Sequence, residues 1–269
     1  MAIQERYTHG HHESVLRSHA WRTVENSAAY LIPHLAEGAS VLDVGSGPGT
    51  ITIDLARRVS PGRVVGIDAS AEVVAQASAL AADDGVTNVT FAVGDAYALD
   101  FADDTFDIVH AHQILQHVAD PVAALREFRR VLKPGGIVAA RDVDWGGTMW
   151  APLLPGLSDW MTANQAIHRS NGGEPLAGRS LKRWALEAGF DAVESSASIW
   201  CFSSDEERQW WGESWSVRVL ESSFATHAIE SGIASLAELQ AISAAWLDWV
   251  KAEDGWYAMP HGEIIARAS

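Results

Sequence analysis

The amino-acid sequence predicts an α/β fold in which a doubly wound, mainly parallel sheet carries helices on both faces. Short runs rich in β-branched residues alternate with amphipathic stretches over the first half of the chain. A glycine-rich turn follows the first of these runs, and two longer segments interrupt the alternation later on. Strand–helix alternation of this kind indicates right-handed crossovers and a parallel sheet that is covered on both sides.

The regular part of the pattern extends to about Val143. It is preceded by a helix expected from Ser18 to Leu35, because apolar residues recur there at helical spacing and Gly38 follows. Strands are expected at Val41–Val44, Arg63–Ile67, Val89–Val93, Phe106–His110 and Ile137–Val143, and helices at Thr50–Val59, Ala71–Ala82 and Pro121–Leu132.

Beyond Val143 the alternation stops. Residues 144–173 contain no clear strand, Leu181–Ala188 predicts a helix, and residues 205–254 are helix-like. Strands are expected in the segments FDAVESSASIWCF and WYAMPHGEIIARA, the second with a bend at Pro260–Gly262.

Two insertions, residues 144–176 and 204–254, each follow the carboxyl end of an expected strand. That edge is where ligands bind in open α/β sheets. We therefore expect both insertions to form a helical cap over the site, within one domain spanning residues 1–269.

Composition excludes several classes of function. The 269 residues include 19 Lys and Arg against 35 Asp and Glu, a formal net charge of −16 that repels nucleic-acid phosphates and argues against a nucleic-acid partner. Cys201 is the single cysteine, which excludes an internal disulfide and a cysteine-based zinc site. The N-terminal residues lack the apolar core of a signal peptide, and no apolar run is long enough for a membrane span. A cytoplasmic location is the resulting expectation.

The segment VLDVGSGPGT carries the clearest ligand signal. Gly45, Gly47 and Gly49 allow a sharp turn and a close approach of the backbone to a ligand. The dinucleotide fingerprint requires another glycine at the position that Thr50 occupies. Asp43 stands two residues before the first glycine, where its carboxylate would repel a pyrophosphate and attract a cationic ligand.

Acidic residues end three successive strands of the expected sheet. Besides Asp43, Asp68 ends the second strand, where a carboxylate can accept hydrogen bonds from ribose hydroxyls. Asp95 ends the third strand, where a carboxylate can accept from an adenine amino group. The three acids together favour an adenosyl group that carries a methionine, which is S-adenosylmethionine, over NAD.

Four segments resemble, in order and spacing, the class I S-adenosylmethionine-dependent methyltransferases: VLDVGSGPG, VVGIDAS, VGDAYALDFADDTFDIVHAHQILQHVADP and LREFRRVLKPGG. The resemblance is greatest to the small-molecule enzymes of the ubiquinone and menaquinone biosynthesis type. It implies a Rossmann-like sheet of seven strands in the order 3-2-1-4-5-7-6 with an antiparallel last strand. The match covers about residues 41–143, and the last expected strand resembles the family's seventh.

The resemblance also implies a set of cofactor-binding residues. The glycine turn and Asp43 would surround the methionine moiety, Asp68 would bind the ribose, and Asp95 with Ala96 would meet the adenine. Tyr7 belongs to an N-terminal segment that folds over the cofactor in relatives. The full predicted set is Asp43, Gly45, Ser46, Gly47, Gly49, Asp68, Ala69, Gly94, Asp95, Ala96, His112 and Tyr7.

Candidates for catalysis lie at the ends of the fourth and fifth strands. His112 and His117 could act as general bases near neutral pH, or could instead pack in the core and shape the site. Asp142 lies beside Arg141, Asp144 and Trp145. This group could contact the substrate or accept a proton, or it could simply form an ion pair at a strand end. His112, His117 and Asp142 are the predicted catalytic residues.

No metal site is expected. His9, His11 and His12 lie close together but lack a complementary carboxylate pattern, which favours a solvated segment. Eleven of the 12 tryptophans follow residue 144, several of them in the two insertions. They could form ordinary core, but we favour an aromatic-lined pocket. Trp211 and Trp215 are the residues expected to face it.

The resulting functional hypothesis is a methyltransferase that moves a methyl group from S-adenosylmethionine to a small, apolar or aromatic acceptor. A non-catalytic protein that binds S-adenosylmethionine and an NAD-dependent enzyme on a related fold are the alternatives. The insertions match no motif that would identify the acceptor, and the sequence is compatible with a homodimer.

Overall fold

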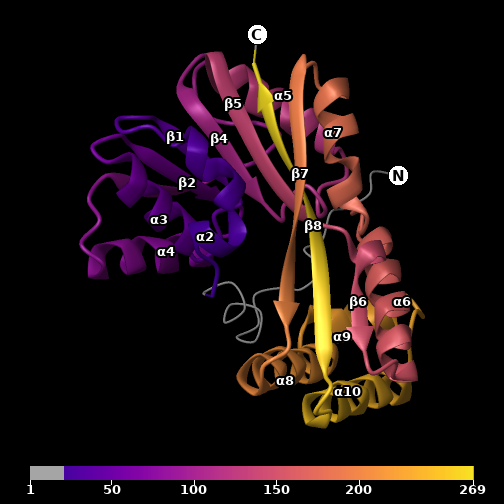
Figure 1. Ribbon diagram of the computed structural model, residues 1–269. Helices are drawn as coiled ribbons and strands as arrows, with labels where there is room; N and C mark the ends of the chain where they lie inside the picture. The colour runs from indigo at the N-terminus through magenta and orange to yellow at the C-terminus, as the bar shows by residue number, and fades with distance from the viewer. Residues whose placement is uncertain (1–20, 269) are drawn as a thin grey trace.

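One twisted sheet organises the chain, and a computed structural model describes it for residues 21–268 (Figure 1). The strands are β1 (Val41–Val44), β2 (Val64–Asp68), β3 (Val89–Val93), β4 (Phe106–His112), β5 (Leu132–Val143), β6 (Met149–Ala151), β7 (Ala192–Phe202) and β8 (Trp256–Arg267). Their order is β3-β2-β1-β4-β5-β8-β6, and β7 pairs with β8. β1 to β5 are parallel, and β8 is antiparallel to its neighbours.

The expected strand order is confirmed, because β8 is the last strand in the chain and lies between β5 and β7. β6 is an addition that the sequence analysis missed. β5 pairs with one half of β8, ending at Val143 opposite His261, and β6 pairs with the other half, beginning at Met149 opposite Ala258. The short 3₁₀ turn η2 (Trp145–Gly147) separates them. β6 thus extends the line of β5 along β8. With three residues, β6 is too short to show the alternation of apolar and polar residues that identifies a strand in a sequence. β8 runs through Pro260–Gly262 as one strand.

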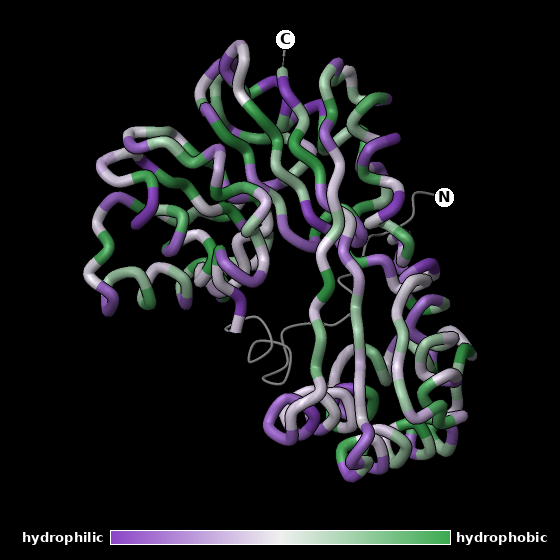
Figure 2. Tube along the Cα trace, in the orientation of Figure 1, coloured by the Kyte–Doolittle hydropathy of each residue, from purple (hydrophilic) through white to green (hydrophobic). Residues whose placement is uncertain are grey.

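Helices cover both faces of the sheet, as expected for a doubly wound fold. On one face lie α2 (Val24–Ser27), η1 (Ala29–His34), α3 (Thr50–Val59) and α4 (Ala71–Asp83), and on the other α5 (Pro121–Val131) and α7 (Ala177–Glu187). Figure 2 shows hydrophobic residues concentrated in the strands between these layers. Alternate residues of the strands serve the two cores: Leu42 and Val65 pack toward α5 and α7, while Val41 and Val64 pack toward α3.

The single helix expected from Ser18 to Leu35 is wrong over its described part. Residues 24–34 form α2 and the 3₁₀ helix η1 instead. Thr23 caps α2 by accepting from the backbone of Asn26, and the side chain of Asn26 accepts from the backbone of Thr23 in return. Ala28 then leaves the helical region with φ of −141°, and Pro33 lies inside η1. The apolar residues of this segment have the spacing of a helix, but the local capping and Pro33 limit it to two short helical pieces.

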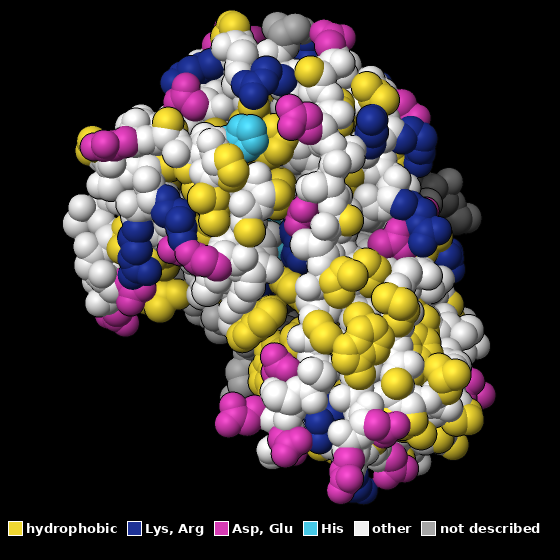
Figure 3. All heavy atoms as spheres, viewed as in Figure 1, with side chains coloured by type: hydrophobic (Ala, Val, Ile, Leu, Met, Phe, Trp, Pro, Cys, Tyr) yellow, Lys and Arg dark blue, Asp and Glu magenta, His cyan; other side chains and the backbone are white. Residues whose placement is uncertain are grey.

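A second helical layer surrounds the far half of the β7–β8 ribbon. It consists of α6 (Pro155–Ser170), α8 (Asp205–Glu221), α9 (Ser223–Glu230) and α10 (Leu236–Lys251) (Figure 1). We call these four helices, with β6 and the adjoining halves of β7 and β8, the cap. Figure 3 shows hydrophobic side chains gathered on the surface of the cap. Exposed examples on its strands are Met149, Ile199 and Trp256. No helix within residues 21–268 is long and apolar enough to cross a membrane.

Candidate active site

The turn between β1 and α3 has a backbone that only glycine adopts easily. Gly45, Gly47 and Gly49 have φ values of 72°, 54° and 87°. A Cβ at Gly45 would lie 2.1 Å from the Cγ2 atom of Ile114, in the loop that follows β4. The amides of Gly45 and Ser46 donate to the carbonyl of Ile67 at 2.8 and 2.9 Å, which ties the turn to β2.

Asp68 lies beside this turn at the end of β2. Its Oδ2 accepts from the amide of Gly47 at 3.1 Å, and its Oδ1 accepts from the amide of Ser70 at 3.0 Å. Each carboxylate oxygen can accept further hydrogen bonds, and the residue is only half-buried. Asp68 is therefore held in a fixed orientation with capacity for two hydroxyl donors, as a ribose requires. Ala69 is exposed next to it.

Asp95 follows β3, the strand beside β2. It is exposed, and its Oδ1 accepts from the amide of Tyr97 at 2.9 Å. The amide of Gly94 donates to the carbonyl of Asp68 at 3.1 Å, so the two acidic strand ends are joined directly. Ala96 packs partly against the core. Neighbouring carboxylates beside a glycine turn match the ribose and adenine of an adenosyl group, and the residues present fit that group.

Asp43 lies beneath the glycine turn. It is 2 % exposed, its Oδ2 accepts from the hydroxyl of Thr52 at 2.5 Å, and its Oδ1 accepts from Nδ1 of His110 at 2.7 Å. These contacts join β1, α3 and β4. A direct electrostatic role of Asp43 toward a cationic ligand stays a prediction, because both oxygens already bind protein groups.

His112 lies at the end of β4 in buried surroundings. Its ring centroid is 5.7 Å from that of Trp200 and 6.4 Å from that of His261. Burial, followed by the charges of Arg22 and Arg141, lowers the pKa of His112 well below its usual value. The imidazole is therefore neutral near pH 7, where it could hold a proton only at a cost.

Asp142 faces the backbone of the loop that follows β4. Its two oxygens accept from the amides of Leu115 and Gln116, both at 3.2 Å. Burial raises the pKa of Asp142 to about 8, against the effect of these two donors. Its described contacts position the loop, and a catalytic role stays a prediction.

The cap helix α6 and the segments before and after it touch the same loop. The indole of Trp145 donates to Oε1 of Gln116 at 3.2 Å, and the amide of Glu174 donates to the carbonyl of Gln116 at 2.9 Å. His117 stacks on His168 of α6, with ring centroids 5.2 Å apart. Burial lowers the pKa of both imidazoles. The structure thus brings His117, Asp142 and Trp145 to one loop, while His112 contacts a different set of residues.

The comparisons with known proteins agree with this geometry. A family model described as a methyltransferase domain matches residues 35–206. An uncharacterized methyltransferase of Schizosaccharomyces pombe is 36 % identical over 269 residues, which cover 96 % of this chain and 95 % of that protein. The chain belongs to the class I S-adenosylmethionine-dependent methyltransferases.

Two further similarities support the assignment. A ubiquinone/menaquinone biosynthesis C-methyltransferase of Bdellovibrio bacteriovorus is 36 % identical to this methyltransferase over 127 residues, 47 % of this chain and 52 % of that protein. This confirms the resemblance that the sequence analysis found. The crystal structure of the YcgJ protein from Bacillus subtilis covers 90 % of this chain and 98 % of its own, with a TM-score of 0.59 and 22 % identity, a likeness of fold.

Several residues surround His112 in this methyltransferase, and of these only Arg141 was among the candidates named from the sequence. Arg141 and Glu263 form a buried ion pair with 3.2 Å between Nε and Oε1, and they face each other across β5 and β8. Gln113 contacts both Arg22 and His261. No sequence motif marks this group, because only the pairing of β8 with β5 brings its members together. Asp144, by contrast, forms the strand-end ion pair that was one of its two interpretations, with Arg179.

The tryptophans of the cap pack mostly against one another. Trp215 is fully buried, with its ring centroid 4.7 Å from that of Trp160, and Trp211 is 4 % exposed. The ring centroids of Trp160 and Trp246 are 4.9 Å apart. The expectation that Trp211 and Trp215 face an acceptor chamber is wrong, because both indoles form the cap's own core.

Four residues singled out in the sequence, Tyr7, His9, His11 and His12, lie outside the described residues. Within residues 21–268, no group of three His, Cys, Asp or Glu side chains could hold a metal ion.

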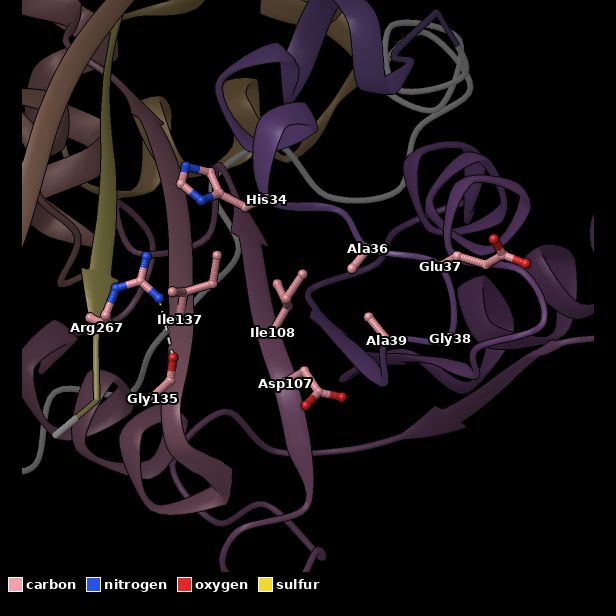
Figure 4. Close-up of a pocket in the computed structure, with 10 residues that line it drawn as sticks. All are labelled: His34, Ala36, Glu37, Gly38, Ala39, Asp107, Ile108, Gly135, Ile137 and Arg267. Carbon is pink, nitrogen blue, oxygen red and sulfur yellow. Dashed lines mark hydrogen bonds between the residues drawn. The ribbon is translucent and has the colours of Figure 1, made fainter.

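A cavity of about 400 Å³ lies at the opposite edge of the sheet (Figure 4). Its lining includes Asp107 and Ile108 near the start of β4, Gly135 in β5 and Arg267 at the end of β8. The glycine turn lies at the carboxyl ends of the same parallel strands. This cavity is therefore not the cofactor site.

Proposed function

We propose that this methyltransferase binds S-adenosylmethionine at the carboxyl ends of β1, β2 and β3 and transfers its methyl group to a small, apolar or aromatic acceptor. The observation that carries the proposal is Asp68, whose carboxylate is fixed by the amides of Gly47 and Ser70 beside Asp95. A sheet edge with two adjacent fixed acids suits a neutral adenosyl group and disfavours a pyrophosphate.

The cofactor, when bound, would supply an electrophilic methyl group on a sulfonium for an in-line displacement. The protein's contribution is then mainly positioning and exclusion of water. Asp68 would orient the ribose, and the glycine turn would admit the methionine moiety close to the backbone. Asp142 would hold the loop of residues 113–117 in place beside it. His112, neutral near pH 7, would be in the form that accepts a proton if the acceptor must lose one, although its lowered pKa makes it a weak base.

The family assignment favours methyl transfer over the two alternatives, binding without catalysis and an NAD-dependent reaction. A homodimer, a cytoplasmic location and the absence of a nucleic-acid partner stay predictions of the sequence alone.

Calorimetry with the purified protein tests the proposal. S-adenosylmethionine and S-adenosylhomocysteine should bind, and NAD and NADP should not bind comparably. Formation of S-adenosylhomocysteine should then accelerate with members of a panel of phenols, quinones, amines and carboxylates. Tight binding of NADH without any response to S-adenosylhomocysteine would refute the assignment of this site.

A further inference from the structure

A ring of nitrogen-bearing side chains surrounds Trp200 at the carboxyl ends of β4 and β5. The guanidinium carbons of Arg141 and Arg22 lie 4.7 and 5.6 Å from the centroid of the Trp200 ring. The imidazoles of His261 and His112 lie 4.5 and 5.7 Å from the same ring. These five residues, which we call the Trp200 cluster, come from β4, β5, β7, β8 and the segment before α2.

Two members of the cluster have buried polar atoms without a hydrogen-bond partner among residues 21–268. Arg141 is 1 % exposed, and its Nη1 has no such partner. His112 is 5 % exposed, and neither of its ring nitrogens has one. The buried hydroxyl of Tyr30 also has no such partner, and burial, against the charge of Arg141, raises the pKa of Tyr30 well above its usual value. Folded proteins rarely leave buried polar atoms unpaired, and a polar ligand would supply partners for these three side chains.

The other end of the Arg141 guanidinium is fixed. Nε donates to Oε1 of Glu263 at 3.2 Å, and Nε and Nη2 donate to the hydroxyl of Ser198 at 3.1 and 3.0 Å. Glu263 in turn accepts from Ser196 and Ser198 at 2.7 and 2.5 Å. Glu263 thus accepts from three donors, and Nη1 of Arg141 is the guanidinium nitrogen that has no hydrogen-bond partner among residues 21–268.

The loop after β4 fixes the rest of the cluster. Gln113 has φ of 55°, an unusual conformation for a residue other than glycine. Its Oε1 accepts from Nη2 of Arg22 at 2.9 Å, and its Nε2 lies 2.7 Å from Nε2 of His261. Nδ1 of His261 lies 3.0 Å from the carbonyl of Met259, so that nitrogen carries the proton and Nε2 accepts from Gln113. A strained residue that orients two neighbours is typical of a ligand site.

We propose that the acceptor of this methyltransferase carries a carboxylate or similar oxyanion, which Arg141 binds through Nη1 beside His112. A guanidinium stays charged when buried and forms strong hydrogen bonds to oxyanions. His112 lies on β4, the strand beside β1, which leads into the glycine turn. In that strand pair, Asp43 lies opposite His110, two residues before His112. The cluster therefore lies at the same edge of the sheet as the proposed cofactor site. The inference rests on the proposed function and narrows its acceptor to anions.

Matched acids and amides test this inference on the wild-type protein saturated with S-adenosylhomocysteine. Benzoate and benzamide, 1-naphthoate and 1-naphthamide, and hexanoate and hexanamide differ within each pair mainly in charge. Calorimetry should show at least one acid binding ten-fold or more tightly than its amide. Equal binding within every pair, or no binding of any acid, would overturn the inference while leaving the proposed function intact.

Two substitutions locate the site. Arg141→Gln should abolish the preference for the acid, and Arg141→Lys should retain part of it because the charge remains. Arg218→Gln is the matched control, since Arg218 is also buried and lies over a tryptophan, Trp215, within the cap. It should keep the full preference.

Binding of S-adenosylhomocysteine separates the remaining outcomes. If Arg141→Gln weakens S-adenosylhomocysteine and leaves the acid preference unchanged, the oxyanion is the cofactor's own carboxylate and the inference is wrong. If the wild-type protein does not bind S-adenosylhomocysteine at all, the proposed function fails, and the inference fails with it.

Discussion

Among single residues, Asp68 has the contacts that a ribose-binding acid requires. Two backbone amides fix its carboxylate, so a ligand hydroxyl meets an acceptor that is already oriented. Asp68→Ala should weaken binding of S-adenosylhomocysteine by about 1.5–3 kcal/mol, because it removes hydrogen bonds to a charged group. Titration calorimetry measures the loss. Asp84→Ala, at the C-terminal end of α4, is the control and should bind like the wild type; equal affinities for both variants would remove Asp68 from the site.

Gly45 offers a second test at the residue scale, with a control of the same backbone conformation. Gly45 and Gly85 have φ of 72° and 66°, so alanine is strained at both. Only at Gly45 would the new Cβ meet another side chain, that of Ile114, while nothing lies within 4 Å at Gly85. Gly85→Ala should therefore cost about 1 kcal/mol of stability and leave affinity unchanged. Gly45→Ala should in addition lower the affinity for S-adenosylhomocysteine, and unchanged affinity there would mean that the turn does not contact the ligand.

Among elements, the loop of residues 113–117 depends on Asp142 of β5. Burial raises the pKa of this carboxyl to about 8, above its value in the unfolded chain. The folded state therefore binds the extra proton between about pH 4 and pH 8, and the contribution of Asp142 to stability falls as the pH rises through that window.

Asp142→Asn removes this titration. It also removes one of the two acceptors for the amides of Leu115 and Gln116, so the variant should be less stable than the wild type at pH 6. The difference in unfolding free energy should narrow at pH 8.5, where the wild-type carboxyl must ionise in its buried place. Urea denaturation at the two pH values measures it. A difference that widens with pH would show that Asp142 is stabilised as an anion.

The same elements explain what the sequence could predict. The strands and helices between residues 41 and 143 follow their expected positions closely, because strand–helix alternation and glycine turns are local signals. The positions of Asp68 and Asp95 at the ends of their strands could be predicted for the same reason, while their roles in binding stay predictions. The ring around Trp200 could not be found, because it depends on β8 returning between β5 and β7. Likewise, no local pattern distinguishes a tryptophan that lines a chamber from Trp215, which packs within the cap.

At the scale of the whole molecule, the cap has a core of its own. Trp215 lies fully buried among other tryptophans of the cap and does not belong to the two cores of the main sheet. Trp215→Ala should destabilise the protein by about 3–5 kcal/mol and lower its Tm by roughly 6–20 °C. Affinity for S-adenosylhomocysteine at 25 °C should stay unchanged, as measured by calorimetry. Trp256→Ala, at a residue 38 % exposed, is the control with a much smaller change in Tm; a selective loss of acceptor binding in Trp215→Ala would return this residue to the acceptor site.

Buried histidines throughout the molecule predict that the fold weakens in mild acid. Burial lowers the pKa of His112, His117 and His261 well below the usual value, and that of His168 to about 3. The unfolded chain takes up these protons below about pH 6.5 and the folded chain does not, so stability present above pH 6.5 is lost as the pH falls.

Each of these four histidines adds up to about 1.4 kcal/mol per pH unit to the slope of the unfolding free energy against pH. The raised pKa of Asp142 gives a slope of the opposite sign over the same pH range, which cancels the share of one histidine. Urea denaturation at pH 7.5, 6.5 and 5.5 should therefore give a steeply falling free energy of unfolding. His168→Gln should reduce the slope of the unfolding free energy against pH by the share of one histidine. Any loss of packing against His117 would lower the stability equally at every pH and would not change this slope. A free energy of unfolding that stays level from pH 7.5 to 5.5 would mean that these imidazoles take up protons in the folded protein, and that the buried polar region around β4 is open to water.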